Sequence, residues 1–147
     1  NVSVSLMHIC AKLGANFTIG NPPGYGMTEE SFDDAQKFAD VSGSTLKMVE
    51  DPHEAVKDSD VIYTDAWTSM GQEEEAAKRE KVFPPYQVNS QLVSEAKDSA
   101  IVMHCLPAHR NLELTDEVAD GPQSRIFPQA HNRLHAQKAI LAKLLVN

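Results

Sequence analysis

One short segment combines a carboxylate, a hydroxyl group and a tryptophan in a way that suits an amino acid ligand. It reads Asp65-Ala66-Trp67-Thr68-Ser69-Met70-Gly71 and follows the strand-like sequence 60–64. A carboxylate at the end of a strand can hold an ammonium group, while a serine and the amides at a helix start can hold a carboxylate. The same residues also fit an ordinary loop in which Ser69 only caps the next helix. The segment therefore indicates either an amino acid site or a capped loop.

A second segment, His104-Cys105-Leu106-Pro107, follows the most hydrophobic strand-like sequence of the chain, at 100–103. A cysteine beside a histidine at a strand end can have a lowered pKa and act as a charged or nucleophilic group. A free cysteine is otherwise commonly a small buried apolar residue, so both interpretations of Cys105 stay open. The bond before Pro107 is of the kind that permits a cis peptide.

Arg133 is the third candidate, and it closes the segment FPQAHNR at 127–133. We expect it near the start of the last helix, where its donors would add to the free backbone amides and suit a phosphate or another oxyanion. Taken alone, Arg133 is equally compatible with a surface arginine. His131 and His135 have the i, i+4 spacing of helical metal ligands, but no third ligand is near, so we expect no metal site and no cofactor.

Strand-like and helix-like segments alternate along the chain and must position these candidates. Strands are expected at about 16–19, 45–49, 60–64 and 100–103, and helices at about 2–13, 28–39, 51–56, 72–81, 89–96, 112–118 and 132–145. This alternation predicts an α/β fold with three layers, in which helices cover both faces of a mostly parallel sheet. Ligands bind such sheets beyond the carboxyl ends of the strands, which selects the loops 20–26, 65–71 and 104–110.

Composition limits the classes of protein that the chain can represent. It has 147 residues and a formal net charge of −8, and 41% of its residues are hydrophobic, so we expect one domain with its own core. The acidic balance argues against binding to nucleic acid. The apolar stretch at 139–146 is interrupted by Lys143 and is too short to span a membrane. Two cysteines, Cys10 and Cys105, make no disulfide framework and favour a reducing compartment.

Taken together, the SMG segment at 65–71, HCLP at 104–107 and FPQAHNR at 127–133 resemble the ornithine carbamoyltransferases, and specifically their C-terminal, ornithine-binding half. The resemblance runs over essentially the whole chain and favours the functional interpretation of each segment. It implies transfer of a carbamoyl group from carbamoyl phosphate to the side-chain amine of L-ornithine, giving L-citrulline and phosphate, in arginine biosynthesis or the urea cycle.

The resemblance also assigns roles to particular residues. The implied substrate-binding residues are Asn1, Asp65, Ser69, Met70, Cys105, Leu106 and Arg133, of which Cys105 and Arg133 are also the expected catalytic residues. The α-amino and α-carboxylate groups of ornithine would be bound by Asn1, Asp65, Ser69 and Met70. Cys105 would contact its side-chain amine, the backbone at Cys105 and Leu106 the carbamoyl group, and Arg133 the carbamoyl phosphate. Because the reaction needs no covalent intermediate, Cys105 need not be a nucleophile.

Two segments of the resembled family, S-T-R-T and H-P-x-Q, do not occur in the chain. The family carries them in an N-terminal domain that completes the carbamoyl phosphate site. We therefore expect residues 1–147 to be the ornithine-binding half without that domain or the first strand of its own sheet, and to be inactive alone. We expect the last helix, 131–147, to pack on the missing domain.

For the full enzyme, the resemblance implies a homo-oligomer built from trimers. The expected compartment is the cytoplasm, or an organelle matrix if a transit peptide has been lost. Two other functions stay open: an amino-acid-binding domain without chemistry, and a carbamoyltransferase for another amine such as putrescine. A grip on the α-carboxylate argues against putrescine, which has none.

Overall fold

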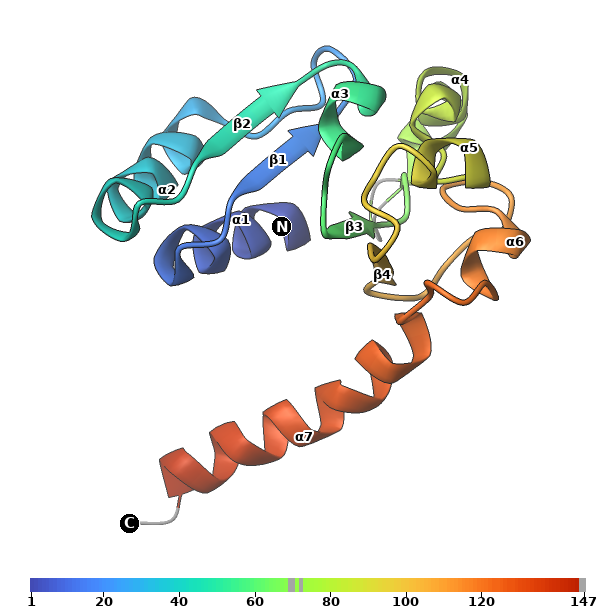
Figure 1. The fold of residues 1–147 in the computed structure, drawn as a ribbon. Helices are drawn as coiled ribbons and strands as arrows, with labels where there is room; N and C mark the ends of the chain where they lie inside the picture. Colours follow the sequence, from blue (N-terminus) through green and yellow to red (C-terminus); the bar gives the residue numbers. More distant parts are fainter. Residues whose placement is uncertain (69–70, 72, 146–147) are drawn as a thin grey trace. The chain divides into compact units, whose positions relative to one another are not determined.

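The chain contains short parallel strands joined by helices, as seen in a computed structural model that describes residues 1–68, 71 and 73–145 (Figure 1). It divides into two compact units, residues 1–57 and 58–147, so the expected single domain consists of two parts. Within the described residues, no helix combines the length and apolar composition that crossing a bilayer requires.

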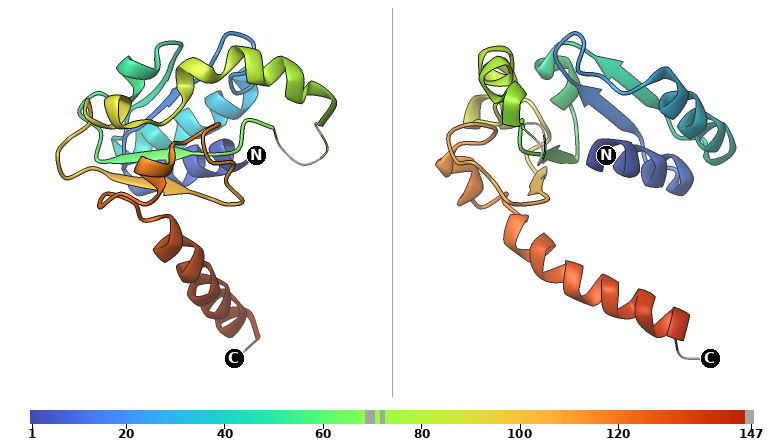
Figure 2. Two further views of the ribbon diagram at one scale, coloured as in Figure 1. Left: turned by 90° about the vertical axis from the view of Figure 1, so that its right-hand side faces the viewer. Right: turned by 180° about the vertical axis from the view of Figure 1, so that it is seen from behind.

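The first unit is built around one parallel strand pair. Its elements are α1 (Val2–Leu13), β1 (Phe17–Gly20), α2 (Glu29–Ser42), β2 (Leu46–Val49) and α3 (Pro52–Val56). Phe17 lies opposite Leu46 in the ladder. Helices α1 and α2 pack against each other (Figure 2), and their buried residues form one core with Leu46. The buried members of this core are Met7, Ala11, Ala35, Ala39 and Leu46.

Local sequence signals set the helix ends in this unit, as predicted. The side chain of Asn1 accepts a hydrogen bond from the Val2 amide at 2.7 Å, and α1 ends at Gly14, whose φ of 77° suits glycine. Thr28 accepts from the Ser31 amide at the start of α2, and Asp51 accepts from the His53 amide at the start of α3.

The second unit contains the other parallel pair. Its elements are β3 (Val61–Thr64), η1 (Glu73–Glu75), α4 (Ala76–Val82), η2 (Pro84–Tyr86), α5 (Ser90–Val93), β4 (Ile101–His104), α6 (Asp116–Ala119) and α7 (Ile126–Leu145). Strands β3 and β4 run parallel and in register, from Val61 opposite Ile101 to Thr64 opposite His104. The predicted α/β class and the parallel strand direction are confirmed. Among the described residues, however, the strands form two separate hydrogen-bonded pairs, and the three-layer arrangement stays a prediction.

The helix predicted at 112–118 is wrong, because backbone pairing occupies its first half. The Val88 amide donates to the Glu113 carbonyl at 2.9 Å, and the Thr115 amide donates to the Val88 carbonyl at 3.1 Å. Leu114 therefore forms an isolated parallel bridge with Val88, and residues 111–113 form a turn. The helix forms only after this contact, as α6, with Thr115 as its N-cap.

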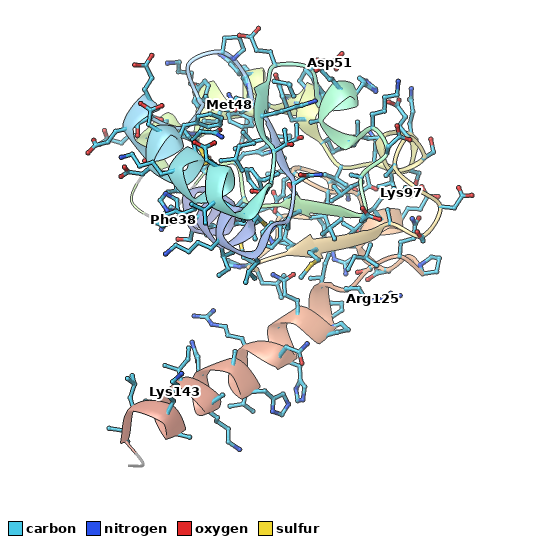
Figure 3. The ribbon with its side chains drawn as sticks, turned by 60° about the vertical axis from the view of Figure 1, so that its left-hand side comes forward. Phe38, Met48, Asp51, Lys97, Arg125 and Lys143 are labelled. Carbon is cyan, nitrogen blue, oxygen red and sulfur yellow. The ribbon has the colours of Figure 1, made fainter. Side chains whose placement is uncertain are left out.

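The predicted start of the last helix, at 131 or 132, is also wrong, because α7 begins at Ile126. Pro128 lies in its first turn, where the missing N–H costs no helical hydrogen bond. The Gln129 amide donates to the Arg125 carbonyl at 2.9 Å and so continues the helix past the proline. Ile126 is buried, whereas every residue from Ala130 to Leu145 is exposed, and the side chains of α7 project from the helix in Figure 3.

Candidate active site

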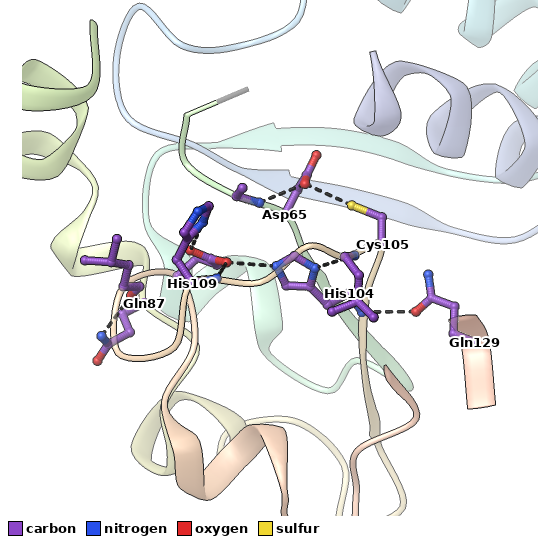
Figure 4. A network of polar contacts seen from close by, with 10 residues as sticks. Asp65, Gln87, His104, Cys105, His109 and Gln129 are labelled. Carbon is purple, nitrogen blue, oxygen red and sulfur yellow. Dashed lines mark hydrogen bonds and ion pairs between the residues drawn. The ribbon is translucent and has the colours of Figure 1, made fainter. Parts of the chain in front are cut away.

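The register of β3 and β4 brings two of the predicted loops together. Because Thr64 lies opposite His104, the next residues, Asp65 and Cys105, leave the ladder side by side at its carboxyl end. The Cys105 thiol donates a hydrogen bond to Oδ1 of Asp65, with 2.9 Å between sulfur and oxygen (Figure 4). The same oxygen accepts from the Ala66 amide at 2.8 Å. The two residues predicted to bind opposite ends of one ligand are thus in direct contact.

Cys105 is a neutral thiol in this setting. Burial, followed by the hydrogen bond to Asp65 and the charge of that carboxylate, raises its pKa to about 11. Of the two interpretations of Cys105 that the sequence leaves open, the one with a pKa lowered by a neighbouring histidine is therefore wrong. The thiol is protonated at neutral pH, where it serves as a hydrogen-bond donor and not as a thiolate.

His104 does not activate Cys105 because both of its ring nitrogens are engaged elsewhere. Its Nε2 lies 3.0 Å from Oε1 of Glu113, and its Nδ1 accepts a hydrogen bond from the Leu106 amide at 2.8 Å. Since the amide can only donate, Nδ1 must be the acceptor and Nε2 carries the proton. This fixes a neutral tautomer for a ring that is 0% exposed.

Glu113 holds the loop that follows His104 through hydrogen bonds to His104 and to the His109 amide. Its side chain is 1% exposed, and its Oε1 also accepts from the His109 amide at 2.6 Å. Burial opposes ionisation of this carboxyl, but the hydrogen bonds from His104 and the His109 amide outweigh it and lower the Glu113 pKa. The loop is therefore held by a buried carboxylate. Sequence reasoning missed it, because no spacing rule connects His104 to a glutamate nine residues later.

Leu106 makes an unusual turn between these contacts. Its φ is 56°, and the peptide bond to Pro107 is cis, which confirms the cis form considered from the sequence. A leucine in the left-handed region costs about 1 kcal/mol, and such conformations cluster at ligand sites. Because its amide is bound to His104, a backbone contact from Leu106 to a ligand would use its carbonyl oxygen.

Gln129, in the first turn of α7, ties this helix to both strands. Its Oε1 accepts from the His104 amide and its Nε2 donates to the Tyr63 hydroxyl, each at 3.0 Å. Burial raises the pKa of Tyr63, with a further contribution from Cys105. Gln129 was not among the predicted site residues, although it lies in the segment FPQAHNR that carries Arg133.

The match to known proteins covers nearly the whole chain. The family model described as the aspartate/ornithine carbamoyltransferase Asp/Orn-binding domain matches residues 1–144. The chain belongs to this family. Within it, the ornithine carbamoyltransferase of Bacillus subtilis is 53% identical over 145 residues, which are 99% of this chain and 46% of that protein. The Thermococcus kodakarensis enzyme of the same name is 52% identical over the same shares.

Solved structures give the same relationship. The ornithine carbamoyltransferase from Pyrococcus furiosus superposes with a TM-score of 0.91 at 53% identity, over 97% of this chain and 45% of that one. A structure of N-acetyl-L-ornithine transcarbamylase has a TM-score of 0.85 at 30% identity, over 97% of this chain and 44% of that one. The chain therefore spans about half the length of the relatives it matches.

Two other predicted residues of this carbamoyltransferase domain, Arg133 and Asn1, lie on or beside helices. Arg133 is exposed and lies two turns into α7, so its interpretation as an arginine at a helix N-terminus is wrong. Asn1 belongs to the first unit, where it caps α1. Ser69 and Met70 lie outside the described residues.

A second arginine supports the loop that starts at Asp65. Nη1 of Arg79, in α4, donates to the Trp67 carbonyl at 3.0 Å. The guanidinium also pairs with Glu75 at 3.0 Å, and the Arg79 side chain is only 16% exposed. The loop of the carbamoyltransferase domain is thus anchored at Trp67, just before the residues that the structure leaves undescribed. In the described parts of the chain, no three His, Cys, Asp or Glu residues gather as a metal site.

Proposed function

We propose that this chain is the ornithine-binding half of an enzyme that transfers a carbamoyl group from carbamoyl phosphate to the side-chain amine of L-ornithine. The products are L-citrulline and phosphate, and the role is in arginine biosynthesis. The observation that carries the proposal is the contact between Asp65 and Cys105 at 2.9 Å, at the carboxyl end of paired strands. Support also comes from 53% identity to an ornithine carbamoyltransferase.

The reaction requires an unprotonated amine and a polarised carbonyl group. The amine nitrogen attacks the carbonyl carbon and the new C–N bond forms. The bond to the phosphate oxygen breaks, and the departing phosphate takes up the proton that the amine loses. Asp65 supplies a carboxylate for an ornithine ammonium group, and Cys105 supplies a thiol beside the reacting amine. The backbone of Cys105 and Leu106 contacts the carbamoyl group in this proposal. This division of roles needs positioning and no covalent intermediate.

The other residues complete the two substrate sites in this proposal. Asn1, Ser69 and Met70 bind the α-amino and α-carboxylate groups of ornithine, and Arg133 binds carbamoyl phosphate. Arg133 is exposed on a helix whose later turns also expose apolar side chains. These apolar residues are Leu134, Ile140, Leu141, Leu144 and Leu145. A second domain packed on that stripe would bury it and enclose Arg133, so the chain by itself should not form citrulline.

We further propose that the whole enzyme is a homo-oligomer based on trimers and works in the cytoplasm, or in an organelle matrix if it carries a transit peptide. Both proposals are supported by family membership alone. Analytical ultracentrifugation of the whole enzyme and subcellular fractionation test them.

A chimera tests the activity directly. We would replace the matching 145 residues of the Bacillus subtilis enzyme with this chain and measure citrulline formation, with the isolated chain in parallel. The chimera should be active and the isolated chain inactive. In the chimera, Cys105→Ala and Asp65→Asn should each lower kcat/KM by at least about 100-fold, the order of a lost catalytic contact. Cys10→Ala, at the other free cysteine, is the matched control and should retain activity.

The acceptor distinguishes the alternatives. Ornithine should be the preferred acceptor of the chimera over putrescine and N-acetyl-L-ornithine. A preference for putrescine would show that the enzyme is a carbamoyltransferase for another amine and not for ornithine. A folded chimera that binds ornithine in a calorimetric titration but carbamoylates no amine would indicate a binding domain without chemistry.

A further inference from the structure

Two histidines lie together on α7, outside the candidate active site. His131 and His135 are one turn apart, both are exposed, and their Nε2 atoms are 3.2 Å apart. The ring centroids are 4.9 Å apart with an interplanar angle of 75°. Since the two Nε2 atoms are closer together than the ring centres, these nitrogens face each other.

The separation of these nitrogens matches that of two ligands on one metal ion. A zinc–imidazole bond is about 2.0–2.1 Å, so two such ligands are about 3.4 Å apart at a tetrahedral angle and about 2.9 Å apart at a right angle. The observed 3.2 Å lies between these values. An ion can therefore take the place of the proton shared by the rings with little change in either side chain.

The histidine pair faces away from the part of α7 that the proposed function uses. At 3.6 residues per turn, Arg133 lies about 180° around the helix from the middle of the pair. Of the exposed apolar residues, Ile140 and Leu144 lie almost opposite the pair, whereas Leu134 and Leu145 lie about 80° and 60° from its middle. A domain centred on Arg133, Ile140 and Leu144 would leave His131 and His135 accessible.

We propose that His131 and His135 form a bidentate site for a divalent transition metal ion that favours imidazole, namely Cu²⁺, Ni²⁺ or Zn²⁺. In the described part of the chain no third His, Cys, Asp or Glu completes the group, so water fills the remaining positions. This proposal replaces the expectation of no metal site, which had required a third protein ligand. Lys138, one turn after His135, adds a positive charge on this side and moderates the affinity.

Titration calorimetry of the 147-residue chain with NiCl₂ tests the site, with CuCl₂ and MgCl₂ as comparisons. Cu²⁺ should bind more tightly than Ni²⁺, and Mg²⁺ should not bind, because it prefers oxygen ligands. Each of His131→Gln and His135→Gln should weaken Ni²⁺ binding by at least about tenfold, since the second imidazole binds intramolecularly. Circular dichroism checks that the helix persists in each variant.

A spacing variant provides the matched control. The double substitution His135→Ala with Ala136→His exchanges two neighbouring residues, so the composition is unchanged while the second imidazole moves about 100° further around the helix. If this variant binds Ni²⁺ about tenfold more weakly or worse, the result supports chelation by both histidines. A smaller loss of Ni²⁺ affinity overturns the proposal. In NMR spectra, Ni²⁺ should broaden the ring signals of His131 and His135 before those of His8 and His53. Broadening first at any other histidine would also overturn the proposal.

Discussion

Nε2 of His104 lies 3.0 Å from Oε1 of Glu113, and neither residue is exposed to solvent. The other ring nitrogen of His104 accepts a hydrogen bond from the Leu106 amide, and Glu113 also accepts one from the His109 amide. The His104–Glu113 pair therefore connects the end of β4 to the turn that follows it and to the segment after His109. Cys105 lies between His104 and Leu106 in the sequence, and both of these residues are held in this way. Its position beside Asp65 therefore depends on the buried carboxylate of Glu113, eight residues later.

Removal of Glu113 should destabilise the fold. In Glu113→Ala, the His104 ring and the His109 amide lose their acceptor inside the protein, which should lower the unfolding free energy by about 2–4 kcal/mol. Glu113→Gln keeps an acceptor oxygen and should cost less. Urea denaturation measures both, with the exposed Glu117→Ala as a control that should change little. Equal losses of unfolding free energy in the Ala and Gln variants would contradict a stabilising role for the side-chain acceptor oxygen at position 113.

Acid should remove the contribution of Glu113. Its pKa is lowered in the folded protein from the ordinary value of 4.5, so its stabilisation is present above pH 4.5 and is lost as the pH falls through the folded pKa. The difference in unfolding free energy between the wild type and Glu113→Gln should therefore shrink on acidification below pH 4.5. A difference that stays constant down to acid unfolding would show that the charge contributes nothing.

Alkylation should reveal the raised pKa of Cys105. Iodoacetamide reacts with the thiolate, so the rate at Cys105 should rise with a midpoint near its pKa of about 11, above the ordinary 9.0. Asp65→Asn removes the charge and weakens the hydrogen bond, which should move the midpoint towards 9.0. Mass spectrometry of peptides measures both cysteines, and Cys10, whose raised pKa comes from burial, should not respond to Asp65→Asn.

Replacement of Gln129 should loosen the junction of α7 with the strands. Gln129→Leu leaves the His104 amide and the Tyr63 hydroxyl without their partner, which should cost about 1–3 kcal/mol of unfolding free energy. Gln137→Leu, at an exposed glutamine on the same helix, is the matched control and should be close to neutral. In the active chimera, Gln129→Leu should also lower turnover, because His104 positions Cys105. Equal effects from the two variants would exclude a specific role for Gln129.

The later turns of α7 should be protected only when another domain covers them. In the isolated chain residues 130–145 are exposed, and a helix without tertiary contacts is marginally stable in water. Their amides should exchange with deuterium much faster than those of α1, whose Met7 and Ala11 are buried. In the chimera the same amides should become protected. Exchange that is equally fast in both proteins would refute packing of α7 on the N-terminal domain.

Elements with strong local signals were predictable from the sequence. Asn1, Thr28 and Asp51 each cap a helix through bonds to amides no more than three residues away, and Gly14 ends α1 in the left-handed conformation that glycine favours. The strands were also predictable, because short apolar runs between turn residues are typical of buried strands. Predictions failed where a distant contact prevailed over local preference, as at Glu113, whose carbonyl pairs with the Val88 amide.

The sequence by itself determined the family and the parallel α/β character, and it named Asp65 and Cys105 as candidates, because the motifs and helix caps each lie within a few consecutive residues. Only the tertiary structure decided that these two side chains touch, that Cys105 stays protonated, and that Glu113 and Gln129 hold the loop around it. The physical reason is that these properties depend on strand register and burial. Residues 65 and 105 meet because Thr64 pairs with His104, and a buried thiol beside a carboxylate resists ionisation.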